Sequence, residues 1–273
     1  MKTGLVFRIV AGVVAIGALG IGTFLFGNII LTFLIGPKVT LMQMDTEIFG
    51  KVEVSRAAVP VRGISIVMMD ADNAEAQVDD IKALARAGII TIALDMDRVR
   101  AQLAASPAST ECHYVSDDLK DLAREVENGL QLKRYFYPIV IGRGESAAFA
   151  YAVVAQAPVN TLGGAISVDF QPVLRTDRTY CFDTPQVSTG EGLFALSIPT
   201  EALSDPWRVI APESEMARIT TFQSALDEAQ FVSAESDDAV RSAIIEGAVK
   251  MGGGGDHGVS DLPVAVIEPK EAV

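Results

Sequence analysis

The residues whose types and spacing could do chemistry lie in the stretch Pro138–Ala148, which reads PIVIGRGESAA. Its apolar first half predicts a buried strand, and the small residues that follow allow a sharp turn into a helix. A turn of this kind presents the nucleophile of many acyl-transferring hydrolases. Because the turn strains one residue and crowds those two before and two after it, the flanking residues must be small. The chemistry would be nucleophilic attack on a carbonyl carbon.

Two registers of this turn fit the sequence. In the first, Gly142 and Ser146 are the small flanking residues, the strand ends ahead of Gly142, and the nucleophile position holds Gly144. In the second, Gly144 and Ala148 flank Ser146, which becomes the candidate catalytic serine. The second register requires the buried strand to carry Arg143 one step before the turn. We favour the first register, which leaves a glycine where the nucleophile should be.

A catalytic serine also needs an imidazole to accept its proton, and in this type of site the histidine follows the last strand. His113 precedes the turn, and His257 follows the glycines 252–255 in a stretch that reads as a linker. Residues 235–238, Glu-Ser-Asp-Asp, stand where the base is expected. The candidate acids, which we expect at the surface, are Asp205, Glu213 and Glu215. We interpret the site as catalytically degenerate; the alternative is an active esterase or lipid hydrolase that uses Ser146 and His257.

The loop that should help to form an oxyanion hole is acidic. The apolar run Gly63–Met69 predicts a buried strand, and Asp70-Ala71-Asp72-Asn73 follows it. Carboxylates at this place disfavour a developing oxyanion. With Glu145 they form a cluster of acids near the turn, so Asp70, Asp72 and Glu145 are candidate ligands for a cationic group.

The elements that must position these residues alternate along the chain. Apolar runs typical of buried strands alternate with stretches of helical periodicity, a pattern that predicts an α/β fold with a mostly parallel, doubly wound sheet. After two β-prone segments at 38–44 and 47–54, the expected strands are 63–69, 89–94, 138–142, 161–168, 207–212 and 229–234. The expected helices are 74–87, 116–130, 147–156 and 237–249, with a further amphipathic stretch near 216–226. We expect a loop between 95 and 115, and a polar, threonine-rich excursion between 169 and 206.

The N-terminal segment 1–37 differs from the rest of the chain. No charged residue occurs from Ile9 to Ile35, and about 20 apolar residues suffice for a helix to cross a bilayer. We expect an uncleaved membrane anchor, with a cleaved signal segment as the alternative. Because Lys2 and Arg8 precede the run, the domain at 38–250 should lie outside the cytoplasm, in the periplasm. Residues 251–273, which begin with four glycines after Met251, read as a linker-like tail.

Composition narrows the possible partners. The net charge of −13 argues against nucleic acid as a ligand. The two cysteines, Cys112 and Cys181, have no metal-ligand spacing, and in an oxidising compartment such a pair is expected to form a disulfide. The sequence predicts no metal site and no cofactor.

The stretch Pro138–Val173 resembles the bacterial virulence protein family VirJ/AcvB, specifically the N-terminal half of the two-domain AcvB type. The resemblance extends over nearly all of the chain from about residue 60 onward. Its other supports are Asp70-Ala71-Asp72, Cys112-His113-Tyr114, Ser167-Val168-Asp169-Phe170, Cys181, and the tail Val259–Val264, which is similar to the family's connector into its second domain.

This resemblance implies an α/β-hydrolase fold, a periplasmic location, and a part in virulence and in the hydrolysis of lysyl-phosphatidylglycerol, an aminoacylated membrane lipid. The family's catalytic serine falls on Gly144 of this chain, so the resemblance is to the half without the nucleophile. We therefore expect a membrane-anchored, non-catalytic domain. It would support the processing of aminoacyl-phospholipid or envelope functions, together with a catalytic VirJ-type domain encoded separately.

Overall fold

One long β-sheet organises the computed structural model, which describes residues 37–105, 112–176, 179–181, 186–226 and 229–252. The sheet has eight strands in the order β1-β2-β4-β3-β5-β6-β10-β11. These strands are β1 (Val39–Thr46), β2 (Gly50–Ala57), β3 (Gly63–Met69), β4 (Ile89–Asp95), β5 (Ile139–Arg143), β6 (Gly164–Val168), β10 (Trp207–Ala211) and β11 (Ala229–Ser233).

The six strands from β4 to β11 in this order are all parallel to their neighbours, and β2 is antiparallel to both β1 and β4. The prediction of a mostly parallel sheet is therefore confirmed. Because parallel strands end at the same edge, the turn after β5 lies at the edge reached by the carboxyl ends of β3, β6 and β10. Ligands of open α/β sheets bind at this edge.

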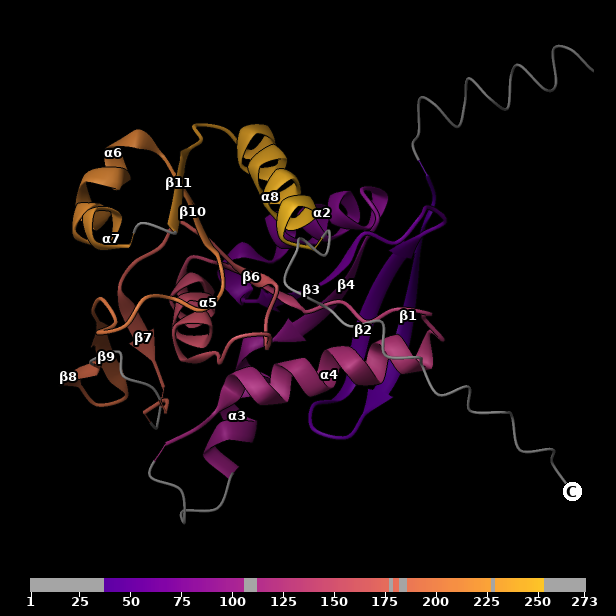
Figure 1. Cartoon of the computed structure of the whole chain (residues 1–273), viewed down its shortest axis with the longest axis horizontal. Helices are drawn as coiled ribbons and strands as arrows, with labels where there is room; N and C mark the ends of the chain where they lie inside the picture. The colour runs from indigo at the N-terminus through magenta and orange to yellow at the C-terminus, as the bar shows by residue number, and fades with distance from the viewer. Residues whose placement is uncertain (1–36, 106–111, 177–178, 182–185, 227–228, 253–273) are drawn as a thin grey trace, which may run out of the picture. The chain divides into compact units, whose positions relative to one another are not determined.

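Helices cover both faces of the sheet, as Figure 1 shows. Helices α2 (Ala74–Arg86) and α8 (Asp237–Gly252) pack against each other on one face. Helices α4 (Val115–Gly129) and α5 (Glu145–Gln156) pack on the other. Short helices α6 (Glu213–Met216), η2 (Ala217–Ile219) and α7 (Thr220–Ala225) connect β10 to β11, and η1 (Ala71–Asn73) follows β3. The structure is thus doubly wound, as the alternation of elements predicted.

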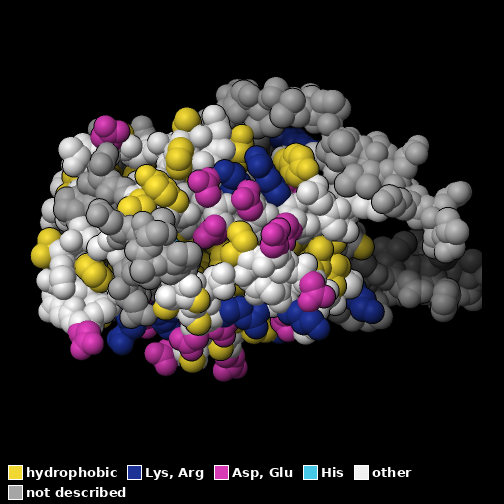
Figure 2. Space-filling model, turned by 90° about the horizontal axis from the view of Figure 1, so that it is seen from below, with side chains coloured by type: hydrophobic (Ala, Val, Ile, Leu, Met, Phe, Trp, Pro, Cys, Tyr) yellow, Lys and Arg dark blue, Asp and Glu magenta, His cyan; other side chains and the backbone are white. Residues whose placement is uncertain are grey.

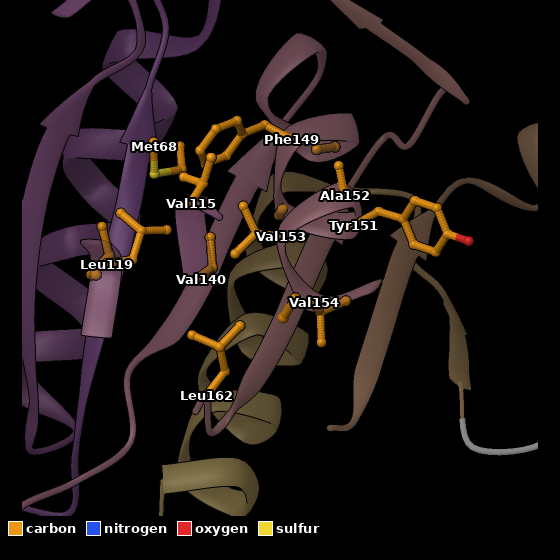
Figure 3. Close-up of a cluster of buried hydrophobic side chains, with 14 of the residues drawn as sticks. Met68, Val115, Leu119, Val140, Phe149, Tyr151, Ala152, Val153, Val154 and Leu162 are labelled. Carbon is orange, nitrogen blue, oxygen red and sulfur yellow. The ribbon is translucent and has the colours of Figure 1, made fainter. Parts of the chain in front are cut away.

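The larger core lies between the sheet and the α4–α5 layer. Ten residues of α5 are buried, which is why its sequence is apolar on nearly all sides. Figure 3 shows Phe149 and Val153 of α5 facing Val115, and Tyr151 directed away from them. The centre of the Tyr151 ring lies 4.5 Å from the centre of the Trp207 ring, and the Tyr151 hydroxyl donates to the Ser197 carbonyl at 2.9 Å. Helix α5 is therefore held rigidly behind the turn that begins it.

The segments 95–115 and 169–206 both contain regular structure, so the loop expected in the first of them is wrong in part. The first segment contains α3 (Met96–Ala105), which Asp95 caps by accepting a hydrogen bond from the Arg98 amide at 2.9 Å. The second contains a separate sheet in the order β7-β9-β8. Its strands are β7 (Val173–Arg175), β8 (Gln186–Gly190) and β9 (Leu193–Leu196).

The described residues from Val39 onward belong to one compact unit. The expected anchor at 9–35 and the expected linker after residue 252 lie outside the described residues. Among the residues that are described, no helix is both long enough and apolar enough to span a bilayer.

Candidate functional site

The turn between β5 and α5 has its apex at Gly144. This residue has φ 60° and ψ −118°, a conformation that costs an L-residue with a side chain about 1–3 kcal/mol. Two residues earlier, a Cβ on Gly142 would collide with the carbonyl oxygen of Ser146. Gly142 and Ser146, which lie two residues before and two residues after Gly144, are therefore packed closely together. This is the arrangement expected in the first of the two registers. The nucleophile position carries no side chain.

The space above the apex is filled by Asn73. A Cβ built on Gly144 would lie 2.8 Å from the Asn73 Nδ2 atom, closer than real contacts allow. Asn73 is fixed because both its backbone amide and its Nδ2 donate to the Asp70 Oδ1 atom at 2.9 Å. The loop that would present oxyanion-hole donors in an active hydrolase therefore covers the turn.

Ser146 has a structural position in the first turn of α5. Its side chain is fully buried. Its Oγ accepts a hydrogen bond from the Arg143 amide at 2.9 Å and lies 2.9 Å from the Arg143 carbonyl and 3.3 Å from the Asp70 Oδ2 atom. The buried Ser146 hydroxyl therefore links the end of β5, the start of α5 and Asp70.

The strand before the turn continues through Arg143, so the expectation that it ends ahead of Gly142 is wrong. Arg143 is buried and pairs with Asp80 of α2 at 3.1 Å, and Arg241 of α8 lies 3.5 Å from the same carboxylate. Burial raises the pKa of the Asp80 carboxyl, although both arginines act to lower it. The Arg143 guanidinium also lies 3.9 Å from Asp169. A buried arginine is tolerated in the strand because α2 and α8 bring its partners.

Of the three acids near the turn, Glu145 is neutralised by two arginines. Glu145 Oε1 binds Arg100 of α3 at 2.6 Å and Arg175 of β7 at 3.2 Å. Asp70 is occupied as the cap of η1, and Asp72 is exposed. Acidic and basic side chains also lie next to each other across the face shown in Figure 2. The ion pairs of Glu145 connect α3 to the small sheet across the mouth of the site.

The places of the catalytic acid and base hold a different contact. After β10 and β11, where these two groups are expected, the Glu213 amide donates to the Glu235 Oε1 atom at 2.9 Å. His113 forms an isolated bridge with Tyr180 beside the disulfide between Cys112 and Cys181. His257 lies outside the described residues. In the described part of the chain, no imidazole is placed at the turn.

The sequence predicted no metal site and placed the candidate acids at the surface. No group of three or more potential metal-binding side chains occurs among the described residues. Glu213 is exposed, but the expectation that Asp205 lies at the surface is wrong, because it is 7% exposed. It precedes β10, at the sheet edge opposite to the turn.

The residues that surround the turn could not be predicted from the sequence. Asn73, Arg100, Arg175 and Asp80 come from four different elements, and each acts through a contact that is distant in sequence. The one local signal was Asp70, since Asp three residues before Asn73 is a typical helix cap. No pattern in the sequence indicated that the capped asparagine would cover Gly144.

A mostly parallel sheet whose central strand turns sharply into a buried helix at its carboxyl end defines the class: this is an α/β-hydrolase-like fold. No known family model matches the chain, and no curated protein sequence matches it. The fold class therefore rests on the chain's own strand order and turn.

Several solved structures are similar to this chain in the arrangement of their backbone. One is the esterase domain of a Rhodothermus marinus protein, at 12% identity, covering 78% of this chain and 98% of that one with a TM-score of 0.44. A dienelactone hydrolase from Anabaena variabilis has 13% identity, coverages of 79% and 97%, and a TM-score of 0.46. Est1E from Butyrivibrio proteoclasticus has 11% identity, coverages of 77% and 98%, and a TM-score of 0.46.

Proposed function

We propose that this domain is a non-catalytic member of the hydrolase-fold class, which acts by binding rather than by hydrolysis. The observation that carries the proposal is the covered apex: Gly144 has no side chain, and the Asn73 side-chain amide lies where a side chain at this position would begin. The buried, hydrogen-bonded Ser146 and the Glu213–Glu235 contact support it. On this proposal, groups that stabilise the fold stand at the positions where the members of a catalytic triad would be.

The finer proposal follows the resemblance to the VirJ/AcvB family. We propose that residues 9–35 hold the domain at the inner membrane, with residues 38–250 in the periplasm. There it would support a separately encoded catalytic domain that acts on lysyl-phosphatidylglycerol or a related aminoacyl-phospholipid. The Cys112–Cys181 disulfide supports an oxidising compartment. Because Glu145 is held by two arginines and Asp70 caps η1, a cationic head group would be received by Asp72.

A fluorophosphonate probe, which labels activated serines, tests the absence of catalysis. The full-length protein should remain unlabelled under conditions in which an active esterase is labelled completely. Ser146→Ala should behave identically, because Ser146 Oγ is hydrogen-bonded to the backbone of Arg143. Labelling of the natural chain that is lost in Ser146→Ala and in His257→Ala would instead establish the alternative, an active serine hydrolase.

The lipid part of the proposal has its own test. Vesicles that contain lysyl-phosphatidylglycerol should retain the protein better than vesicles of phosphatidylglycerol alone. Asp72→Asn should remove that difference, whereas Glu75→Gln, at an exposed position one turn further along, should not. Equal retention on both vesicles would contradict this part while leaving the absence of catalysis untouched.

A further inference from the structure

A second concave site lies at the edge of the sheet opposite to the turn. Three segments that precede the parallel strands β5, β6 and β10 converge there, and the end of α8 joins them. The pocket that they form encloses a volume of about 40 Å³, enough for about three water molecules or one small polar group. Its lining residues are Arg134–Tyr137, Val159, Asn160, Leu162, Gly163, Ser204–Pro206, Met251 and Gly252.

Asp205 is the polar group that this pocket leaves incompletely paired. The side chain is more than nine-tenths buried, and its Oδ2 atom has no hydrogen-bond partner. The Leu162 amide donates to the carboxyl group, and no cation in the described part of the chain forms an ion pair with it. Burial raises the pKa of Asp205 to about 7. A buried carboxyl that keeps one free oxygen costs stability unless a donor fills the space beside it.

The surroundings of Asp205 define the chemistry of that donor. Tyr135 and Tyr137 line the pocket with aromatic rings, which attract cations through their faces. Arg134 also lines the pocket, but it is exposed and its guanidinium lies 5.2 Å from the centre of the Phe136 ring. The buried charge of the pocket is therefore negative and the charge at its rim is positive. A ligand with an ammonium group at one end and an anionic group at the other matches this order.

We propose that this pocket is a binding site for a small ligand carrying a primary ammonium group, which donates to Asp205 Oδ2, and an anionic group that faces Arg134. A primary ammonium fits because it is compact and has three N–H donors. A quaternary ammonium has none, so it leaves Oδ2 unpaired. The site is separate from the covered turn, and it does not depend on whether the turn is catalytic.

The test uses the full-length protein with O-phosphoethanolamine as the probe and phosphocholine as its quaternary counterpart. Nuclear magnetic resonance can follow the Leu162 amide, because that group is hydrogen-bonded to Asp205. O-phosphoethanolamine should shift this resonance with saturation, and phosphocholine should not. Asp205→Asn should weaken binding at least about tenfold, since a hydrogen bond between charged groups is lost. Arg134→Ala should weaken it less, because its charge is exposed.

Two controls make the result decisive. Glu201→Gln removes a negative charge from an exposed position four residues before Asp205 and should leave binding unchanged. Unfolding of Asp205→Asn in urea shows whether the variant is folded, and Asp205→Glu gives a second variant that keeps the charge. Equal binding of both probes, binding that survives Asp205→Asn, or no saturable shift with O-phosphoethanolamine would each overturn the proposal. Ethanolamine alone and phosphatidylethanolamine vesicles distinguish a free ligand from a lipid head group.

Discussion

At the scale of single residues, Gly144 and Asn73 determine what the site can do. In an active hydrolase the strained residue of this turn carries the nucleophile, and the strain serves to expose it. Here the same backbone conformation is kept by a residue without a side chain, at φ 60°, and the space above it is filled from η1. Glycine removes most of the cost of this strained backbone conformation.

Gly144→Ala should destabilise the protein by at least about 2 kcal/mol, because the backbone strain and the collision with Asn73 add together. Gly50→Ala is the matched control: Gly50 has φ 64° but nothing within 4 Å of a Cβ, so only the strain of about 1 kcal/mol applies. The free energy of unfolding in urea measures both. In the Asn73→Ala background the cost of Gly144→Ala should fall, and strictly additive effects would show that the two residues do not compete for space.

At the scale of elements, the contact between β5 and α2 explains why an arginine can end the central strand. Arg143 and Asp80 are 8% and 5% exposed, so neither charge is solvated by water. Removal of one partner from a buried pair leaves the other charge uncompensated. The pair also places α2, α8 and β5 in a fixed relation, since Arg241 reaches the same carboxylate.

Asp80→Asn should therefore lower the free energy of unfolding by about 3–5 kcal/mol. Asp79→Asn, one residue earlier, breaks an exposed pair with Lys82 and should cost less than about 1 kcal/mol. Urea denaturation of both variants gives the comparison. A cost for Asp80→Asn as small as that for Asp79→Asn would mean that Arg143 finds water or another partner when Asp80 loses its charge.

At the scale of the whole molecule, the fold buries carboxyl groups in separate places, among them Glu127 in α4 and Asp205 before β10. Burial raises the pKa of Glu127 to about 8 and that of Asp205 to about 7. The folded protein therefore holds protons that the unfolded chain, with ordinary carboxyl pKa values near 4, has already released. Since the folded state binds more protons at these two groups, the stability that they contribute should fall as the pH rises from about 4.5 to about 8.

Glu127→Gln should flatten this dependence. In the natural chain the Glu127 carboxyl accepts a hydrogen bond from the Phe136 amide at 2.8 Å. The amide oxygen of glutamine can still accept this bond, but glutamine releases no proton as the pH rises. Between pH 5 and pH 8 the variant should lose at least about 1 kcal/mol less stability than the natural chain. Glu125→Gln, at a partly exposed position in the same helix, should follow the natural chain. Parallel curves for Glu127→Gln and the natural chain would contradict the assignment.

The sequence by itself determined the α/β class, the parallel core strands and most of the helices. These features follow from short-range patterns, because apolar runs and helical periodicity report burial directly. Helix α3 was not predicted, although Asp95 supplies an N-cap and Met96, Val99 and Leu103 recur at helical spacing. The glycines at 142 and 144 left two possible registers for the residue at the apex of the turn.

Only the tertiary structure decided what surrounds that turn and where the charges lie. Asn73 over Gly144, Asp80 beside Arg143 and the arginines on Glu145 are contacts between elements that lie far apart in the sequence. The burial of Asp205 likewise depends on three segments that meet before β5, β6 and β10. A sequence pattern shows which face of an element is apolar, but the partner of a polar side chain is set by the elements that the sheet brings together.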